Sequence, residues 1–408
     1  MYDLATMSSW IEFAVRWTHV IVGIAWIGSS FYFIALDLGL HRDRDLASGA
    51  DGEEWQVHGG GFYHIQKYLV APDRMPGDLV WFKWESYSTW LSGFALLVLV
   101  YYLGAEFYLI DPAVMALSTF QAIAISLASL AFGWLAYDRI CKSRFGDDNT
   151  RLMILLYVIL VGMAYFYTSV FSGRAALLHL GAFTATIMSA NVFFIIMPNQ
   201  RIVVADLQAG RTPDAKYGKI AKQRSTHNNY LTLPVIFLML SNHYPLAFAS
   251  DMNWLIASLV FLMGVTIRHY FNSVHARKGD PTWTWLATAL LFILIMWLST
   301  EPMFRAEEPA EATGPAALRF ARADGFDRVQ DIVMGRCSMC HAAEPSWEGL
   351  HWPPKGVRLE TEHQIAMAAK QIYLQAGLTH AMPPANLSFM QVAERAEIVA
   401  WYKAATTR

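Results

Sequence analysis

The sequence predicts an all-α fold, in which a polytopic bundle of about eight membrane-spanning helices precedes a small helical domain. Three observations favour this class. Only 16% of the 408 residues are charged and 55% are hydrophobic, whereas soluble globular proteins carry about 25% charged residues. Eight stretches approach the roughly 20 apolar residues that span a bilayer. From about Leu318 onward the composition becomes that of a soluble domain.

The eight expected spans follow one another along the first 300 residues, and each is predominantly apolar. The sixth is short and contains Pro234, and only the SGR at 172–174 separates the fourth from the fifth. The expected spans are 11–36, 81–103, 113–137, 152–170, 175–197, 229–249, 253–271 and 282–300.

Lys and Arg are unevenly distributed between the connecting loops. The loops after the first, third, fifth and seventh spans hold nearly all of them, and the intervening loops hold almost none. Because positive residues stay on the cytoplasmic side, both termini are expected outside. No Lys or Arg precedes Trp10, so the start does not resemble a cleavable signal peptide. The net charge of −2 gives no indication of nucleic-acid binding.

The first cytoplasmic loop contains HGGGFYHIQKY at 58–68. Its glycines indicate tight turns. Its aromatic residues suggest that the loop lies on the membrane face or folds into it.

MGRCSMCHAAEPSW, at 334–347, contains the spacing Cys-x-x-Cys-His in Cys337, Cys340 and His341. This spacing is typical of covalent haem c attachment, in which two thiols form thioethers and the imidazole is an axial iron ligand. A redox-active or zinc-binding pair is the other interpretation. THAMPPANLS, at 379–388, supplies Met382 as the expected second axial ligand. Its rivals are Met390, Met367 and His380.

Residues 318–408 resemble a class I cytochrome c, which carries electrons. The final helix, expected over 393–405, places Ile398, Trp401 and Tyr402 on one side. This side is expected to pack against the helix that precedes the haem motif, which contains Phe326 and Val329.

The expected domains are a transmembrane domain at 1–302, a Pro-, Ala- and Glu-rich periplasmic linker at 303–317 and the cytochrome domain at 318–408. Haem c is attached in the bacterial periplasm, and an even number of spans places the haem motif there. We therefore expect a multi-pass protein of the bacterial inner membrane whose N-terminus and cytochrome domain are periplasmic.

Ionisable residues inside a membrane are costly and indicate function. His19 lies in the outer half of the first span, and Gly23, one turn below it, leaves room for a flat macrocycle. His179 or His243, at similar depth, could provide a second imidazole for a haem b. The alternative is a histidine that forms hydrogen bonds across helices.

A second group of polar residues gathers toward the cytoplasmic side. Amides, arginine and aromatic residues suit a flat, anionic ligand with many hydrogen-bonding groups, because Arg offers a fork to paired oxygens. Ordinary interfacial polarity is the competing interpretation. The candidates are Glu85, Asn191, His227, Asn228, Asn229, Arg268, His269 and Asn272, and Arg16 joins His19 and His179 if the pocket opens outward.

Four stretches together resemble one family: WTHVIVGIAWIGSSFYF, MSANVFFIIMPNQ, RSTHNNYLTLPVIFLMLSNHYP and the terminal CSMCH. They resemble the bacterial integral-membrane urate oxidase (urate hydroxylase) family, whose members fuse an eight-helix membrane domain to a cytochrome c. The resemblance implies oxidation of urate to 5-hydroxyisourate in purine catabolism, with oxygen from water. It also implies that electrons leave through haem c to a soluble or membrane cytochrome and a terminal oxidase, without peroxide.

Two other functions remain open. The chain could be a haem-c-bearing membrane subunit of a quinol-oxidising respiratory complex. It could also be a transporter that carries a redox sensor, which would move its ligand across vesicles without reducing the haem.

Overall fold

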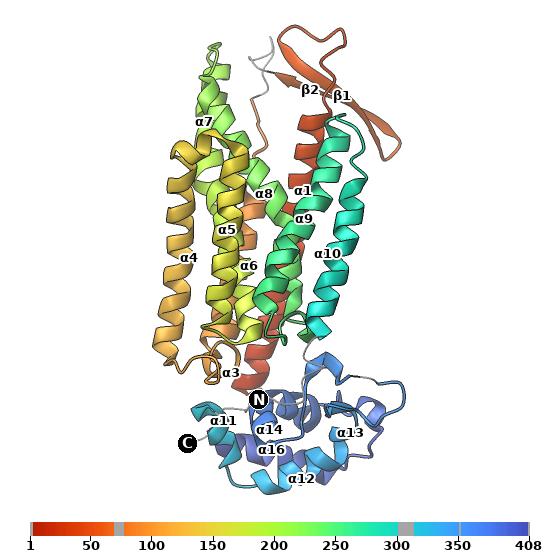
Figure 1. Cartoon of the computed structure of the whole chain (residues 1–408). Coiled ribbons are helices and arrows are strands. Elements are labelled where there is room, and N and C mark those ends of the chain that lie inside the picture. Colours follow the sequence, from red (N-terminus) through yellow and green to blue (C-terminus); the bar gives the residue numbers. More distant parts are fainter. Residues whose placement is uncertain (1–2, 69–76, 301–313, 351, 407–408) are drawn as a thin grey trace.

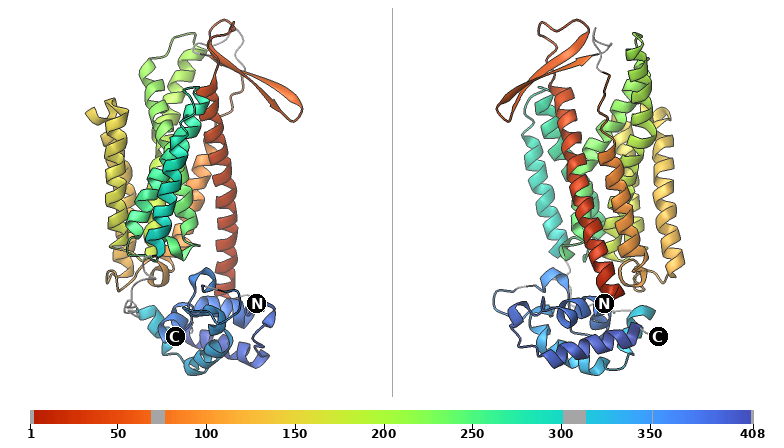
Figure 2. Two further views of the ribbon diagram at one scale, coloured as in Figure 1. Left: turned by 45° about the vertical axis from the view of Figure 1, so that its right-hand side comes forward. Right: turned by 180° about the vertical axis from the view of Figure 1, so that it is seen from behind.

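The protein is mostly helical and consists of three parts stacked along one axis, as the computed structural model shows (Figure 1). The structure describes residues 3–68, 77–300, 314–350 and 352–406. Long helices form a bundle, with a β-hairpin at one end and a small helical domain of C-terminal residues at the other. The N-terminus lies at the same end as the C-terminal domain (Figure 2).

Eight long helical segments of the described residues build the bundle, and each coincides with one expected span, with shifted ends. They are α1 (Leu4–Gly39), α2 (Trp84–Leu96) with the π-helical η1 (Leu97–Tyr102), α4 (Thr119–Cys141), α5 (Asn149–Thr168), α6 (Gly173–Ala190) with the π-helical η3 (Asn191–Ile196) and α7 (Met197–Gln208), α8 (Ala215–Ser241), α9 (Asn253–His275) and α10 (Trp283–Thr300).

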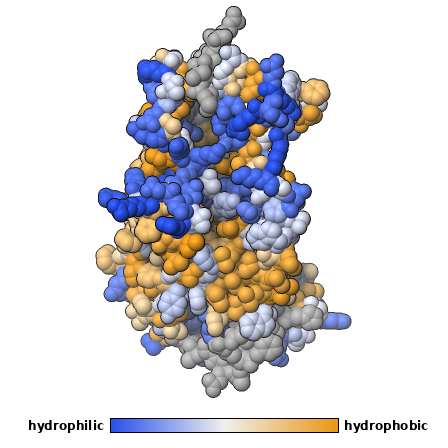
Figure 3. All heavy atoms as spheres, turned by 45° about the horizontal axis from the view of Figure 1, so that its top comes forward, coloured by the Kyte–Doolittle hydropathy of each residue, from blue (hydrophilic) through white to orange (hydrophobic). Residues whose placement is uncertain are grey.

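Six of these helices are long and apolar enough to cross a membrane: α1, α4, α5, the continuous Gly173–Gln208, α9 and α10. Segments α2–η1 and α8 are less apolar, because α2 begins with polar residues and α8 begins with the charged AKYGKIAKQR. Hydrophilic residues gather at the hairpin end and hydrophobic residues cover the side of the bundle (Figure 3). These features are compatible with a membrane protein.

The core of the bundle lies among η1, α4, α5 and α6, where Leu109, Leu152 and Phe171 are fully buried. Helix α5 ends at Thr168, and α6 begins after Ser172, whose hydroxyl accepts a hydrogen bond from the Ala175 amide. Residues 169–172 therefore separate the two helices, and of the SGR stretch only Ser172 lies outside them, as the N-cap of α6.

The β-hairpin departs from the all-α prediction. Strands β1 (Ala50–His58) and β2 (Gly61–Tyr68) pair antiparallel. Gly59 and Gly60 join them, both with positive φ, as a two-residue hairpin loop requires. The tight turn was predicted correctly, but the strands were missed. Two contacts hold the hairpin on α1: the Tyr32 hydroxyl donates to Gln56, and Lys67 pairs with Asp37.

The C-terminal domain is a cluster of short helices around one core. Trp401 is 1% exposed, and its ring centroid lies 6.0 Å from that of Phe326. Ile398 and Val329 belong to the same buried cluster, so the predicted packing of the last helix is confirmed. The helices are α11 (Pro315–Ala321), α12 (Phe326–Arg336), α13 (Ser338–His341), η6 (Pro354–Gly356), α14 (Glu362–Met367), α15 (Ala369–Ile372), η7 (Tyr373–Leu378), η8 (Pro384–Asn386) and α16 (Val392–Thr406).

The expected linker at 303–317 falls mostly outside the described residues. Helix α11 begins at Pro315, slightly before the expected start of the domain at Leu318. The difference is explained by Pro315 itself, because proline suits the first turn of a helix.

The C-terminal domain packs directly on the end of the bundle. Gly356 of η6 lies against Pro245 of η4 (Pro245–Ala247) so closely that a Cβ on Gly356 would be 2.2 Å from Pro245 Cγ. Hydrogen bonds also join Lys370 to Ser8, Gln371 to Tyr108 of α3 (Ala105–Tyr108), and Tyr373 to Asp3.

Candidate functional site

The polar residues expected toward the cytoplasmic side form two separate clusters, one on each side of α8. The first, which we call the Arg224 cluster, comprises Tyr137, Asp138, Asn191, Arg224, His227 and Asn228. Arg224 is 1% exposed and donates to Asp138 Oδ1 at 2.9 Å. Its charge is therefore neutralised inside the protein.

The amides of the Arg224 cluster are also satisfied internally. Asn191 Nδ2 lies 3.0 Å from both the Tyr137 hydroxyl and Asn228 Oδ1, and Asn228 donates to the Met188 carbonyl. The Tyr137 hydroxyl forms a 2.8 Å hydrogen bond with Nδ1 of His227. This network links α4, η3 and α8, and its main role is to hold these three elements together.

The second, the Arg268 cluster, comprises Asn229, Arg268 and Asn272. Asn272 Nδ2 donates to Asn229 Oδ1 at 2.9 Å, and Arg268 donates to Asn272 Oδ1 at 2.9 Å and to Asn229 Oδ1 at 3.4 Å. Its neighbours are neutral oxygens and the Phe31 ring, whose centroid lies 4.0 Å from the guanidinium carbon. Arg268 is 5% exposed, yet no carboxylate among the described residues pairs with it.

Two polar atoms beside this uncompensated charge lack partners. Asn229 is fully buried, and its Nδ2 has no hydrogen-bond partner. His275 lies on the same face of α9 as Arg268 and Asn272, and its Nδ1 is also buried without a partner. A buried positive charge beside an unsatisfied donor favours binding of an anion, because both would otherwise carry a desolvation cost.

Sequence reasoning did not predict Phe31 as a neighbour of Arg268, and it named His275 among the inner polar residues without assigning it to the substrate site. Phe31 lies within WTHVIVGIAWIGSSFYF, but no pattern there indicates that its ring faces Arg268. His275 was detectable, because the spacing 268, 272, 275 places all three on one helix face. Two expected members do not join either cluster: His269 is exposed near Trp283, and the Glu85 carboxylate forms no ion pair with the described residues.

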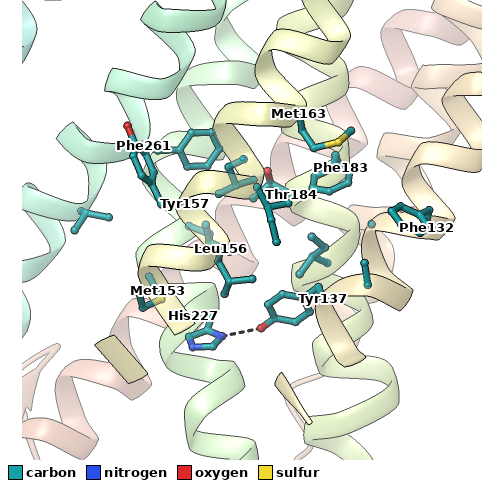
Figure 4. A pocket seen from close by; sticks show the side chains of 17 residues that line it. Phe132, Tyr137, Met153, Leu156, Tyr157, Met163, Phe183, Thr184, His227 and Phe261 are labelled. Atoms are coloured by element: carbon teal, nitrogen blue, oxygen red, sulfur yellow. Dashed lines mark hydrogen bonds between the residues drawn. The ribbon is translucent and has the colours of Figure 1, made fainter. Parts of the chain in front are cut away.

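A cavity of about 90 Å³ lies among α4, α5, α6, α8 and α9, with His227 and Tyr137 at one end (Figure 4). Most of its lining is aliphatic or aromatic. The hydroxyls of Tyr157 and Thr184 already donate to backbone carbonyls. The cavity therefore suits an apolar ligand and not a purine anion.

The Cys-x-x-Cys-His residues lie where α12 ends and α13 begins. His341 Nδ1–H donates to the Val357 carbonyl at 2.8 Å, which leaves Nε2 as the basic nitrogen. A histidine that ligates a metal typically donates its other ring N–H in this way. Burial raises the pKa of the Cys337 thiol to about 12, and burial also raises the pKa of Cys340. A redox-active pair needs a lowered thiol pKa, so these values do not favour that interpretation.

The loop that contains Met382 is fixed by a buried arginine. Arg395 is 6% exposed and donates to the carbonyls of Ala376 and Met382, at 2.6 and 2.8 Å. Met382 itself is half-buried beside the core. Of its rivals, Met390 is a buried core residue, Met367 packs at the edge of the same core, and His380 is exposed.

Residues 5–299 match the protein family described as urate oxidase N-terminal. The match covers most of the chain and includes both polar clusters. The chain belongs to this family. Family membership supports an oxidoreductase whose chemistry is related to urate oxidation. No curated protein and no solved structure matches the chain.

The three histidines that were expected to ligate a haem b, His19, His179 and His243, have different surroundings. His19 Nδ1–H donates to the Thr89 carbonyl at 3.1 Å, and its ring lies against Gly93. Its Nε2 forms no hydrogen bond with the described residues. His179 is fully buried, and both its nitrogens form hydrogen bonds, to Ala175 and Ser126. His243 is exposed in the turn after α8.

Proposed function

We propose that the protein oxidises urate to 5-hydroxyisourate at a membrane and passes the electrons to a haem c in its C-terminal domain. The half-reaction converts urate and water to 5-hydroxyisourate, two protons and two electrons. The electrons would continue to a soluble or membrane cytochrome and a terminal oxidase, without formation of peroxide. The observation that carries the proposal is the buried, uncompensated charge of Arg268 in a chain of the urate oxidase N-terminal family.

The Arg268 cluster is the proposed urate site. Urate is a planar anion at neutral pH, with carbonyl and N–H groups around its edge. Arg268 would compensate the charge, and Asn229 Nδ2 would donate to a carbonyl oxygen. Asn272 is partly exposed. His275, whose Nδ1 is buried without a hydrogen-bond partner, lies on the same face of α9 and would accept or donate a proton as water adds.

The C-terminal domain fits a covalently attached haem c. A bound haem c supplies a one-electron acceptor. Cys337 and Cys340 would hold the haem covalently, and His341 Nε2, oriented through the Val357 carbonyl, would bind its iron. Arg395 holds the backbone of the Met382 loop, so that the Met382 thioether would be the second ligand.

The proposed haem b relay receives only partial support. His19 fits an axial ligand because its Nδ1–H is engaged and its Nε2 remains basic. His179 does not fit, because both its nitrogens form hydrogen bonds and aromatic rings enclose it. A haem c would accept one electron at a time, so a two-electron oxidation would need either a haem c that is reoxidised between the two electrons or a second acceptor in the protein.

We further infer that α2–η1 and α8 also cross the membrane, giving eight spans. Both pack inside the bundle, α2 against α1 and α8 between α6 and α9. An even number of spans places the N-terminus and the C-terminal domain on the same side of the membrane, and both lie at the same end of the bundle (Figure 1). The Lys- and Arg-rich loops lie at the opposite end, which would be cytoplasmic in a bacterial inner membrane.

One anaerobic spectrum tests the proposal. The full-length protein is purified in detergent, oxidised, freed of oxygen and mixed with urate, and the reduced-minus-oxidised difference is recorded. A c-type band that grows with urate is expected, at two equivalents of haem per urate. A haem c that stays oxidised with urate but is reduced by a quinol would contradict the proposal.

That outcome would favour the second candidate, a quinol-oxidising respiratory subunit. The apolar cavity beside His227 and Tyr137 supports this alternative, since it suits a ring with an apolar tail (Figure 4). Quinol-site inhibitors distinguish the two candidates, because they should leave urate-dependent reduction unchanged if the first proposal holds.

A further inference from the structure

A second group of uncompensated polar atoms lies at the opposite end of the bundle from the Arg268 cluster, beside the C-terminal domain. Tyr101 of η1 is 3% exposed, and its hydroxyl has no hydrogen-bond partner. Arg174, in the first turn of α6, also has a buried Nε without a partner. Arg174 lies close enough for its charge to act on the Tyr101 hydroxyl.

Arg174 is the main positive charge that acts on Tyr101, and Lys355 adds a positive charge near His243. The charges of Arg16 and Arg174 act on Tyr101, and together with Lys355 they act on His243. Glu12 neutralises Arg16 at 2.7 Å. Arg174 and Lys355 form no ion pair with the described residues; the guanidinium of Arg174 lies over the Tyr108 ring, 5.3 Å from its centroid.

The two unpartnered atoms cannot satisfy each other completely. Arg174 Nε–H could donate to the Tyr101 oxygen, but the Tyr101 O–H proton would still need an acceptor. A neutral acceptor would leave the excess positive charge in place. An oxyanion would satisfy both, because it accepts several hydrogen bonds and compensates the charge.

We propose that this junction, formed by Tyr101, Arg174, Arg16, His243 and Lys355, binds a small oxyanion. Lys355 is contributed by the C-terminal domain and the other four residues by the bundle. A bound oxyanion therefore bridges the two parts. Lys355 also precedes Gly356, which packs on Pro245, and Val357, whose carbonyl orients His341. Occupancy of the junction thus stabilises the arrangement in which the C-terminal domain is docked.

The oxyanion could be free in solution or could be the phosphate of a lipid headgroup, since the junction lies at the end of the bundle. Urate is one of the oxyanions that would be free in solution. Both sources present oxygen acceptors with negative charge, and the experiment separates them.

Isothermal titration of inorganic phosphate into the full-length haem protein, in nonionic detergent and low chloride, tests the site. Saturable binding is expected, and Tyr101→Phe and Arg174→Gln should each weaken it by about tenfold or more. Arg151→Gln is the matched control, because this arginine is 79% exposed on the side chain and lies outside the junction. Tyr101→Phe removes a single oxygen, so it remains informative even if Arg174→Gln folds poorly.

Two further arms identify the source. Urate that displaces phosphate makes the purine anion a ligand of the junction. Loss of phosphate binding in phosphatidylglycerol nanodiscs, but not in phosphatidylcholine nanodiscs, assigns the site to an anionic lipid. Equal phosphate affinity in the wild type and both variants, or no saturable binding in any arm, overturns the inference. Neither result depends on urate oxidation, so the inference and the proposed function fail separately.

Discussion

At the scale of single residues, the two buried arginines of the bundle differ in what compensates their charge. Arg224 has Asp138 at 2.9 Å, whereas Arg268 has only amide oxygens and an aromatic ring. The first is a structural ion pair, whose loss would leave a buried carboxylate uncompensated. The second has no carboxylate partner among the described residues, and this difference is the reason for placing Arg268 in the proposed substrate site.

Arg268→Gln should therefore weaken urate binding strongly. Loss of a charge-assisted hydrogen bond costs about 1.5–3 kcal/mol, which corresponds to a rise of roughly 10- to 100-fold in KM. The measurement is urate-dependent haem reduction under anaerobic conditions, with haem content as the check on folding. Arg151→Gln serves as the exposed control, and an unchanged KM in Arg268→Gln would exclude the Arg268 cluster as the urate site.

The C-terminal domain should lose stability in acid because of Glu394. Burial alone would raise the pKa of this carboxyl, but the two-pronged hydrogen bond from Arg336 and its charge lower the pKa below its ordinary value. Because the pKa is lowered in the folded protein, the ionised carboxylate contributes its full stabilisation when the pH is above the ordinary glutamate pKa. This stabilisation is lost as the pH falls through the lowered pKa of Glu394.

Glu394→Gln should thus reduce the free energy of unfolding by about 1 kcal/mol at neutral pH. The difference from wild type should shrink toward zero as the pH falls below the ordinary glutamate value of about 4.3 and through the lowered pKa of Glu394. Denaturant unfolding of the full-length protein in detergent, followed by the haem absorbance at several pH values, measures both. A difference that is independent of pH would show that the Glu394 charge has no part in the effect.

Sequence reasoning predicted which residues belong to the polar clusters more reliably than which of these residues contact one another. Asn229, Arg268 and Asn272 were selected because amides and arginine are rare in a membrane, and the structure brings them together. Their separation from Asn191, His227 and Asn228 could not be predicted, because it depends on which side of α8 each residue faces. Adjacent residues Asn228 and Asn229 point about 100° apart on a helix, so they join different clusters.

At the scale of elements, the contact between α8 and α9 depends on one glycine. Pro234 interrupts the hydrogen bonding of α8, and its ring fills the space beside Gly264 of α9. A Cβ on Gly264 would lie 2.5 Å from Pro234 Cδ. Since Asn229 lies on α8 and Arg268 on α9, this contact also sets the spacing of the Arg268 cluster.

Gly264→Ala should destabilise the bundle by about 1–3 kcal/mol, because the added methyl group forces the two helices apart. The matched control is Gly162→Ala in α5, where a Cβ meets open space. This control should be neutral or slightly stabilising, since alanine favours a helix. The midpoint of thermal unfolding in detergent measures both, and equal midpoints would contradict the role of this contact.

Elements were predicted well where the apolar stretch in the sequence was long, and poorly where it was short. Each expected span corresponds to a helix, because about 20 consecutive apolar residues leave the backbone little alternative in a membrane. The hairpin was missed because its strands are only nine and eight residues long. Such short amphipathic stretches depend on pairing with each other, which hydropathy does not reveal.

At the scale of the whole molecule, the docking of the C-terminal domain is the feature that sequence could not provide. The positive-inside rule placed that domain and the N-terminus on one side, and both lie at one end of the bundle. The rule says nothing about contacts such as Gly356 on Pro245. Those depend on surface shape, which residue types alone do not determine.

Gly356→Ala should loosen this docking. The added Cβ would collide with Pro245, and the positive φ of Gly356 also disfavours alanine. Gly349→Ala is the matched control, because Gly349 also has a positive φ but faces open space. Stopped-flow mixing with urate should show slower haem reduction in Gly356→Ala alone, with haem content unchanged. Equal rates in the two variants would mean that the contact does not position the domain for electron transfer.

Helix α1 extends from one end of the molecule to the other. At 1.5 Å per residue, its 36 residues span about 54 Å, well beyond a bilayer core of about 30 Å. Its first residues, Asp3 and Ser8, are bonded to the C-terminal domain, and its last turns, through Tyr32 and Asp37, hold the hairpin. One continuous helix thus connects the two ends of the bundle. A tilt of the C-terminal domain should therefore displace the hairpin at the other end, so a spectroscopic label placed on the hairpin would report on movement of that domain.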